Sequence, residues 1–443
     1  MQLKQAKHDA SASAKTQKVK NIGSALAAAT CALLGKPASA EAITDGWQID
    51  TALLYYGETD RVTAVEAVIA AQKDLGDELV FSGKLVIDTL SGASASGAVA
   101  QPTVQTFTRP SGNGQYQTAP GDVPLDDTFR DTRLQLNGQW TKPVWQDMRI
   151  SGGVHLSKEY DYLSLGVNAS LARDFNKNNT TVSGGLSYSY DNIDPEGGRP
   201  VPLSSMVVNV GQFANEEDFR NAFNHTRLAG SDNKTTTDLL FGLTQVLNRR
   251  LIMQFNYGFS VVKGYTTDPF KVLSVVNQQG LTQELVYENR PDERTKHNFY
   301  WQTKYAMDSG VADISYRFAS DDWEIDSHTI DSRLRFNLSD TNYIQSHFRY
   351  YQQSAAEFYQ PFLLEDQPLP QFASADYRLG EMTAYTLGIK YGMTLDKGNE
   401  LAFRLEYYQQ DPKNAAGIAP GALQELDLYP SVKAIIAQVS YSF

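Results

Sequence analysis

The chain has 443 residues, of which 41% are hydrophobic and 11% aromatic, so it has room for one large domain or several small ones. Its formal net charge of −12 opposes binding to nucleic acid, and no basic patch counters that interpretation. Beyond the N-terminus there is no run of about 20 apolar residues, which excludes a membrane-spanning helix. A β-barrel remains compatible with this composition, because its apolar surface is spread over alternate residues.

Residues 1–40 have the pattern of a signal peptide. A lysine-rich start precedes a short apolar core at 22–35, and Ala38-Ser39-Ala40 is a small-x-small cleavage site. We predict cleavage after Ala40. Removing this segment takes away six Lys and one Asp, so residues 41–443 carry 33 basic and 50 acidic residues, a net charge of −17. The single cysteine, Cys31, is lost with it, which leaves no disulfide or thiolate chemistry.

Alternation of apolar and polar residues predicts sixteen strands in the remaining chain. Segment 61–73 also has a helical interpretation, but Val65, Ala67 and Ile69 fit one face of a strand. The predicted strands are 47–55, 61–73, 79–90, 132–140, 148–156, 163–171, 182–190, 239–243, 253–259, 299–305, 314–318, 330–338, 344–350, 385–393, 401–407 and 431–443.

The connections between these strands are sorted by length. Five are long and irregular, namely 91–127, 192–234, 264–293, 354–379 and 410–429. Counted along the chain they are connections 3, 7, 9, 13 and 15, all odd, whereas every even connection is a short turn. In an antiparallel up-and-down sheet, odd and even connections lie at opposite ends. Short periplasmic turns and long extracellular loops are typical of outer-membrane barrels, whereas a soluble sandwich has no reason to sort its loops.

The last strand supports the same interpretation. Val439, Tyr441 and the terminal Phe443 share one face, opposite Gln438, Ser440 and Ser442. A chain that stops on Phe after such a row resembles the closing strand of a bacterial outer-membrane barrel, whose end is read by the barrel-insertion machinery. The alternative is an ordinary edge strand that ends the protein.

We therefore predict an all-β fold, a transmembrane up-and-down antiparallel barrel of about 16 strands over residues 41–443, located in the bacterial outer membrane. Closure follows from the solvent, because no backbone N–H or C=O can stay unpaired in hydrocarbon. A barrel of this size leaves a lumen wide enough for water.

Several stretches resemble one family, the bacterial outer-membrane proteins catalogued as domain of unknown function 3570. They are GKLVIDTLSGASASGA (83–98), QTFTRPSG (105–112), the segment 124–133 that ends in TFRDTR, SKEYDYLSLGVNASLARDFN (157–176), NTTVSGGLSYSYDNIDPEGGRP (179–200) and the terminal SYSF. The resemblance implies a barrel and outer-membrane placement, and it supplies no reaction. It also points to flavin-transferase and small lipoprotein components of extracytoplasmic redox systems as context.

Strand parity gives the residues expected to line the pore. A basic wall is predicted from Lys304, Arg317, Arg333, Arg335, Arg349, Lys390 and Arg404, and an acidic wall from Asp50, Glu66, Asp88 and Asp131. Walls of opposite sign across a pore create a transverse field that favours dipolar or anionic solutes. The alternative is that these charges pair with their neighbours and wet the interior.

Chemical motifs are sparse. No His pairs at metal-ligand spacing, no G-x-S-x-G or P-loop occurs, and no cofactor or metal is predicted. His328 and His347 lie on adjacent predicted strands, where they could approach each other. In the longest loop, EEDFRNAF (216–223) favours a short helix, either in a segment folded into the pore or in an exposed lid. The acids of GQFANEEDF and DNIDPEGG are weak candidates for a divalent ion.

The function expected is that of a porin-like channel for small solutes or an exported product, and not an enzyme. The alternative is a non-conducting barrel that scaffolds a secretion or electron-transfer assembly, and an outer-membrane hydrolase is a third possibility. Expected partners are outer-membrane lipid and lipopolysaccharide, the barrel-assembly machinery, and periplasmic lipoprotein or redox proteins.

Overall fold

The computed structural model describes residues 46–59, 61–395, 398–413, 419–429 and 431–443, with the side chains of 127–129 not described. The predicted signal peptide, residues 1–40 with cleavage after Ala40, lies outside this part of the chain. No helix within the described ranges is both long and apolar enough to cross a membrane.

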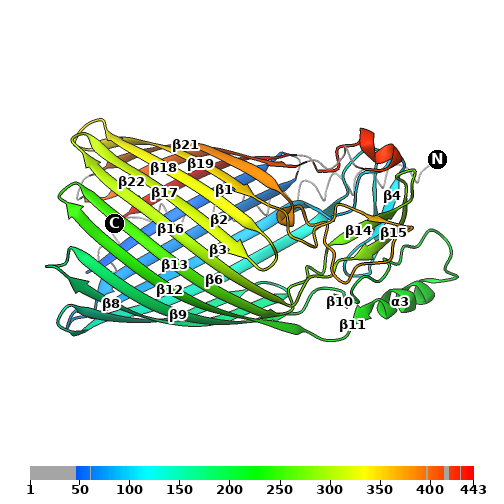
Figure 1. Cartoon of the computed structure of the whole chain (residues 1–443), viewed down its shortest axis with the longest axis horizontal. Coiled ribbons are helices and arrows are strands. Elements are labelled where there is room, and N and C mark those ends of the chain that lie inside the picture. The colour runs from blue at the N-terminus through cyan, green and yellow to red at the C-terminus, as the bar shows by residue number, and fades with distance from the viewer. Residues whose placement is uncertain (1–45, 60, 396–397, 414–418, 430) are drawn as a thin grey trace, which may run out of the picture.

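Sixteen antiparallel strands form a closed barrel, as predicted (Figure 1). Each strand pairs with its neighbours in chain order, and β23 pairs with β1 to close the ring, with Leu53 opposite Val439. The strands are β1 (Trp47–Glu58), β2 (Val62–Asp74), β3 (Val80–Ala95), β6 (Leu125–Trp145), β7 (Met148–Lys158), β8 (Tyr162–Phe175), β9 (Thr180–Ile193), β12 (Asp232–Asn248), β13 (Leu251–Gly264), β16 (Glu293–Met307), β17 (Gly310–Asp321), β18 (Asp326–Asn337), β19 (Asn342–Gln353), β21 (Met382–Thr394), β22 (Glu400–Pro412) and β23 (Val432–Ser442). The ambiguous segment 61–73 is therefore a strand.

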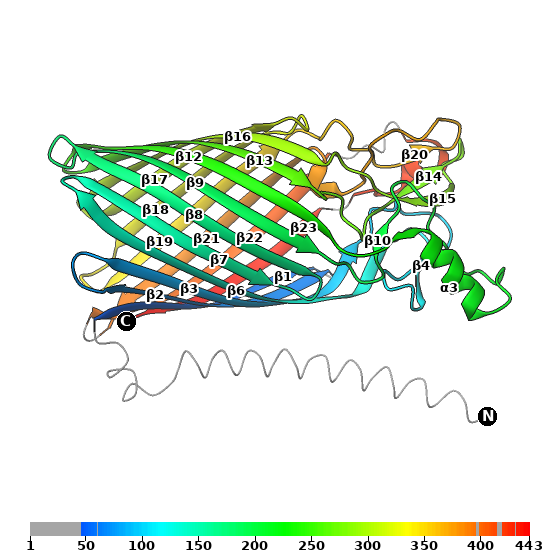
Figure 2. The ribbon, with the colours of Figure 1, turned by 90° about the horizontal axis from the view of Figure 1, so that it is seen from below.

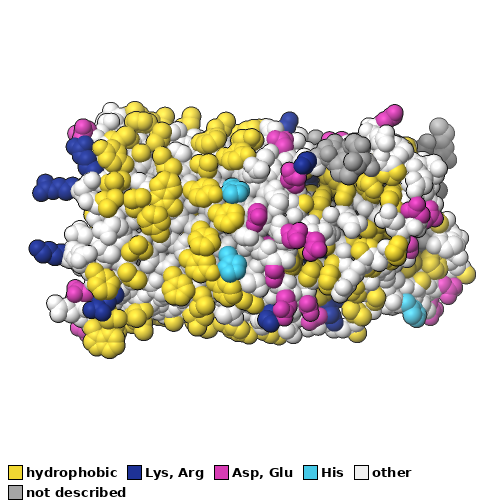
Figure 3. Space-filling model, in the orientation of Figure 1, with side chains coloured by type: hydrophobic (Ala, Val, Ile, Leu, Met, Phe, Trp, Pro, Cys, Tyr) yellow, Lys and Arg dark blue, Asp and Glu magenta, His cyan; other side chains and the backbone are white. Residues whose placement is uncertain are grey.

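The two faces of the barrel wall differ in chemistry. The register aligns Ser332, Phe348, Leu387 and Tyr407 in one row across four strands. The neighbouring row, on the other face, contains Arg333, His347, Gly388 and Glu406. Large hydrophobic side chains such as Leu387 and Ile389 are more than half exposed on the outer surface. Figure 3 shows a hydrophobic band over this surface, with basic side chains at one end and acidic side chains towards the other. Alternation along each strand thus gives an apolar outside and a polar inside.

All five long connections lie at the same end of the barrel, as Figures 1 and 2 show. We call this the loop end and the opposite end the turn end. The barrel strands extend further than the sequence pattern indicated, so the five connections are residues 96–124, 194–231, 265–292, 354–381 and 413–431. The start of β1 and Phe443 both lie at the turn end, where the amide of Phe443 donates to the carbonyl of Ile49.

The sequence suggested that the five connections are irregular, but their described residues fold together into a cap. The cap contains β4 (Gln105–Thr108) paired with β5 (Gln115–Thr118), β10 (Arg199–Pro200) paired with β11 (Arg227–Leu228), and α3 (Glu216–His225). It also contains a sheet in the order β15 (Thr282–Tyr287), β14 (Val272–Val276), β20 (Leu363–Leu364). Short 3-10 turns occur at η1 (Tyr377–Leu379) and η4 (Gly421–Glu425).

Hydrophobic clusters join the cap loops to one another. One cluster combines Leu273 and Val286 with Leu363 and Ala373 from the fourth loop. A second cluster joins the first, third and fifth loops and contains Val99, Val276, Ala419, Leu423 and Leu428. A third joins the first and third loops with Met206 of the second, and contains Ala98, Phe107, Val272 and Tyr287. A fourth joins the fourth loop to the β17–β18 turn and contains Trp323, Ile325, Ala356, Phe358 and Leu379. Among the described residues, most of the fully buried apolar side chains therefore belong to the cap.

Candidate functional site

The inner face of β16 to β22 carries the predicted basic wall, and most of its cations contact a carboxylate. Arg349 and Arg333 contact Asp331 at 2.8 and 3.4 Å, and Arg404 contacts Glu406 at 3.8 Å. Lys304 lies 3.6 Å from Asp313, and Lys390 lies 3.5 Å from Glu400. Arg335 and Arg317 stand over the rings of Tyr343 and Tyr300, at 3.6 and 5.7 Å. Pairing with neighbours, the alternative left open by the sequence, therefore accounts for part of this wall.

Two glycines on β21 allow longer contacts across this wall. His347 of β19 lies opposite Gly388 and reaches past it to Glu406 of β22, with its Nδ1 2.8 Å from a carboxylate oxygen. A Cβ at Gly388 would lie only 2.5 Å from Glu406 Cγ, so this position needs glycine. Gly392 serves Tyr343 in the same way, and the Tyr343 hydroxyl donates to Glu400 at 2.5 Å.

The predicted acidic wall on β1 to β6 is more divided. Asp50 is exposed beside an indentation of about 330 Å³ that Lys84 also lines. Glu66 lies opposite Asp88 in the register, and Asp88 forms an ion pair of 2.7 Å with Arg133. Asp131 lies near the loop end, beside Glu159 in the β7–β8 turn. Burial and then the charge of Asp131 raise the pKa of Glu159 to about 7.

The two walls are not diametrically opposed. Around the ring, only β23 separates β22 from β1 on one side, whereas five strands, β7, β8, β9, β12 and β13, separate β6 from β16 on the other. The inner face between them is formed largely by small side chains, including Ser164, Gly166, Ser183, Ser187 and Ser189. Long charged and aromatic side chains are thus concentrated on one part of the inner surface.

His328 and His347 do not approach each other. His347 lies on the inner face, between Asp331 at 3.0 Å and Glu406 at 2.8 Å. His328 lies on the outer face, where its Nδ1 is 2.7 Å from the Tyr316 hydroxyl and its ring is near Phe318. Adjacent strands were correctly inferred, but the residues have opposite parity in the register and so face opposite sides. The described residues include no group of three or more His, Cys, Asp or Glu arranged to hold a metal ion.

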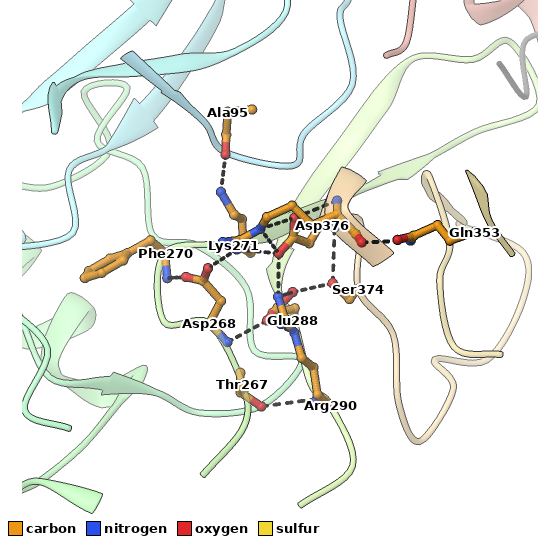
Figure 4. A network of polar contacts seen from close by, with 11 residues as sticks. Ala95, Thr267, Asp268, Phe270, Lys271, Glu288, Arg290, Gln353, Ser374 and Asp376 are labelled. Carbon is orange, nitrogen blue, oxygen red and sulfur yellow. Dashed lines mark hydrogen bonds and ion pairs between the residues drawn. The ribbon is translucent and has the colours of Figure 1, made fainter. Parts of the chain in front are cut away.

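A second charged network lies inside the cap (Figure 4). Glu288 and Asp376 are almost fully buried, and Arg290 bridges them at 2.6 and 2.8 Å. Arg378 connects Asp376 to Asp268, and the ammonium of Lys271 donates to the carbonyl of Ala95 at the end of β3. The Ser374 hydroxyl donates to Glu288. This network ties the third and fourth long loops to each other and to the barrel.

The pKa values of the two buried cap carboxylates, Glu288 and Asp376, shift in opposite directions. Burial raises the pKa of Glu288 to about 7, although the adjacent Arg290 acts in the opposite direction. Burial also acts to raise the pKa of Asp376, but Arg378, Lys271 and Arg290 outweigh it and hold that pKa well below its ordinary value. Near neutral pH, therefore, Glu288 exchanges a proton while Asp376 stays ionised.

A chamber of about 890 Å³ lies between the cap and the mouth of the barrel. The barrel contributes Arg130, Asp131 and Lys234 to its lining, and the cap contributes Tyr265, Arg290 and many others. The chamber therefore adjoins the mouth of the barrel at the loop end.

The longest loop, expected either to enter the pore or to form a lid, is part of the cap. Its helix α3 covers 216–225, so the short helix predicted at EEDFRNAF is confirmed and is longer than expected. Asn215 caps it by accepting from the amide of Asp218. The buried Phe223 lies close to Gly112 of the first loop, and Figure 1 shows the helix at the outer edge of the loop end.

The predicted insertion signal lies on the last strand, β23. Val439 and Tyr441 occupy the outer row beside Phe403 and Leu401, and the rings of Tyr441 and Phe443 meet edge to face at 4.7 Å. The placement is that of a lipid-facing row, and recognition by insertion machinery stays a prediction.

Comparison with protein-family models assigns the chain to a family. A family model described as a protein of unknown function, DUF3570, matches residues 23–443. The chain belongs to this family. The resemblance drawn from the sequence motifs is thereby confirmed. A sequence comparison with curated proteins found no match for this DUF3570 member.

Solved structures similar to this DUF3570 member include several outer-membrane proteins. A bacterial polysaccharide outer membrane secretin is 8% identical, with a TM-score of 0.40, and the match covers 90% of this chain and 98% of that one. The P. putida toluene transporter TodX is 11% identical with a TM-score of 0.38, covering 93% of both chains. The siderophore receptor PirA from Acinetobacter baumannii is 8% identical with a TM-score of 0.40, covering 83% of this chain and 53% of that one. At these identities the likeness concerns the barrel fold alone.

Sequence reasoning missed the cap network of the DUF3570 member. Glu288, Arg290 and Asp376 lie in segments without periodicity, and nothing local marks them as partners. One signal was available, because Val272–Val276 reads VLSVV, a short apolar run typical of a buried strand. It lay within a segment interpreted as a loop, and all five of its residues are buried.

Proposed function

We propose that this chain is an outer-membrane channel that passes small solutes through its barrel. The observation that carries the proposal is the inner face of a closed barrel lined by charged and polar residues, within an apolar outer face. Charged and polar residues on the inner face do not pack against lipid. They make favourable contacts with water and polar solutes in the bore.

In this proposal the pore-lining residues are those of the basic wall, including Arg333, Arg335 and Arg349, and those of the acidic wall, including Asp50 and Glu66. The cap faces the outside of the cell and the turn end faces the periplasm. Outer-membrane lipid and lipopolysaccharide surround the apolar band, and the barrel-assembly machinery inserts the chain through its final strand.

Planar-bilayer recording of the purified full chain tests the proposal. We expect steady conductance, and we expect the triple substitution Arg333→Gln, Arg335→Gln, Arg349→Gln to change it and to shift ion preference towards cations. The matched control is Arg250→Gln, which removes an exposed ion pair with Asp308 at the turn end. A folded barrel that never conducts contradicts the channel.

A second candidate function follows from the cap. The loops cover the loop end with a structure that has its own hydrophobic clusters, and such a cover suits a barrel that scaffolds an assembly and conducts little. Co-purification with periplasmic lipoprotein or redox proteins, together with a silent bilayer, favours this scaffold. Steady conductance without such partners argues against it.

A further inference from the structure

The inner wall formed by β18, β19, β21 and β22 has an unequal arrangement of charges. Two of its carboxylates lie low against the wall: the side chains of Asp331 and Glu406 are 11% and 6% exposed. Its cations stand above them: the side chains of Arg349 and Arg333 are 47% and 42% exposed. At Asp331 and Glu406, a solute in the bore therefore meets guanidinium groups before it meets a carboxylate. The third carboxylate, Glu400, is 34% exposed, about as much as its partner Lys390 at 30%.

Each of these carboxylates also contacts more than one partner. Asp331 accepts from Arg349 at 2.8 Å and lies 3.0 Å from His347. Glu406 is held by the same histidine, and Glu400 accepts from Tyr343. Each carboxylate is thus bound by His347 or Tyr343 as well as by a cation. This leaves the cations only partly neutralised.

The balance of charge favours an anion. On the inner face of these strands, five cationic side chains, those of Arg333, Arg335, Arg349, Lys390 and Arg404, accompany three carboxylates, those of Asp331, Glu400 and Glu406. This leaves an excess of two positive charges, with His347 not counted. Complete mutual pairing would need equal numbers. The alternative in which these charges only pair with neighbours therefore does not account for the whole set.

A cavity is present where the cations converge. An indentation of about 220 Å³ is lined by Arg333, Lys390 and Arg404 together with the neutral donors Gln345, Gln438 and Ser440. His347 and the carboxylate of Glu406, which contact each other, also line it. The register explains the convergence, because Lys390 lies opposite Gln345 on one side and Arg404 on the other, and Arg404 lies opposite Gln438. Charged and neutral N–H and O–H donors around a small cavity are the groups that bind an oxyanion.

We propose that this indentation is a binding site for a small oxyanion, the carboxylate or phosphate group of a soluble solute. The proposal deepens the channel function and rests on it only for the route by which the solute arrives. The glycines at 388 and 392 are part of the site, because they let His347 reach Glu406 and let Tyr343 reach Glu400.

Calorimetric titration of the detergent-solubilised full chain with inorganic phosphate tests the site directly. We expect saturable binding that weakens at least about tenfold in the double variant Arg333→Gln, Lys390→Gln, because a tenfold change is what loss of one charge-assisted contact of about 1.4 kcal/mol gives. Arg250→Gln serves as the control and should bind like the wild type. Tetraethylammonium should not bind to this site.

Folding of each variant is checked by gel mobility before and after boiling. If the double variant does not fold, the single variant Lys390→Gln is tested instead. The ion pair of Lys390 with Glu400 is long, at 3.5 Å, so its loss should disturb folding little. Phosphate binding that is absent in the wild type, or unchanged in a folded variant, overturns the site.

Bilayer recording separates this result from the channel itself. Phosphate binding in a barrel that never conducts supports the site and contradicts the channel. Conductance without phosphate binding supports the channel and contradicts the site. If both hold, added phosphate should reduce chloride conductance in the wild type and much less in Lys390→Gln.

Discussion

The barrel wall and the cap are stabilised in different ways. In the wall, hydrogen-bonded ladders join neighbours in chain order, and side chains such as Leu387 and Leu405 remain more than half exposed on the outside. In the cap, side chains such as Leu273 and Leu423 are fully buried among residues from other loops. The wall needs an apolar solvent to be satisfied, whereas the cap carries its own core, like a small soluble domain.

Single substitutions should therefore affect stability differently in the wall and in the cap. In the wall the backbone ladder is closed and lipid replaces packing, so truncating an outer side chain removes few contacts. In the cap a truncation opens a cavity or leaves a buried charge without its partner. The cap should therefore unfold before the barrel when the protein is destabilised.

The largest effect is expected from Arg290→Met. The substitution leaves Glu288 and Asp376 buried without the cation between them, and breaking a buried pair in this way costs about 3–5 kcal/mol. Hydrogen exchange of residues 265–292 and 354–381 should rise while exchange in the barrel strands stays unchanged. Arg250→Met, in an exposed ion pair at the turn end, is the control. Unchanged protection of the cap would contradict the assigned role of the network.

A somewhat smaller effect is expected from Leu273→Ala. Leu273 is fully buried between the third and fourth loops, and removing such a side chain costs about 2–5 kcal/mol. Limited proteolysis should cut the cap faster in this variant. Leu387→Ala, on the lipid-facing surface, should be cut like the wild type. Equal rates for both variants would show that the cap has no core of its own.

The stability of the cap should also depend on pH through Glu288. Its pKa of about 7 in the folded protein lies above the ordinary value of 4.5. Between these values the unfolded chain loses a proton that the folded chain keeps, so the free energy of unfolding falls as pH rises from about 5 to 7. The full change is on the order of 3 kcal/mol.

Glu288→Gln removes this titration and should flatten the curve over the same range. Denaturant unfolding of the cap, followed at several pH values, measures both proteins. A slope that persists in Glu288→Gln would assign the pH dependence to another group, such as Glu159, whose pKa is also raised to about 7.

The smallest effect is expected from Gly388→Ala on the inner wall. The added Cβ would lie 2.5 Å from Glu406 Cγ, which forces the side chain to move and costs about 1–3 kcal/mol. Gly258→Ala is the control, because its Cβ would meet Asn298 Cβ at an ordinary 3.6 Å. The temperature at which each folded band is lost on a gel compares the two. Equal temperatures would contradict the need for glycine at 388.

The sequence predicted the wall because its rule is local. Alternation in segments such as 385–393 is visible without knowledge of any partner, and the odd numbering of the long connections placed them at one end. The cap follows no local rule. Arg290 and Asp376 are 86 residues apart, and their contact depends on how two loops pack. The residues of the predicted basic wall lie on the inner face of the barrel, but the low placement of Asp331 and Glu406 depends on His347 and on glycine at 388, which only the register reveals.

Accessibility along β21 tests the central claim, that one wall separates lipid from a polar bore. Residues 41–443 contain no cysteine, so single cysteines at residues 384–393 can carry nitroxide spin labels in a reconstituted protein in which Cys31 is removed or replaced. We predict alternation: labels at odd positions such as Leu387 and Ile389 collide mainly with oxygen, and labels at even positions such as Thr386 and Lys390 mainly with a water-soluble nickel complex. Equal accessibility at neighbouring positions, or a helical period, would contradict the account.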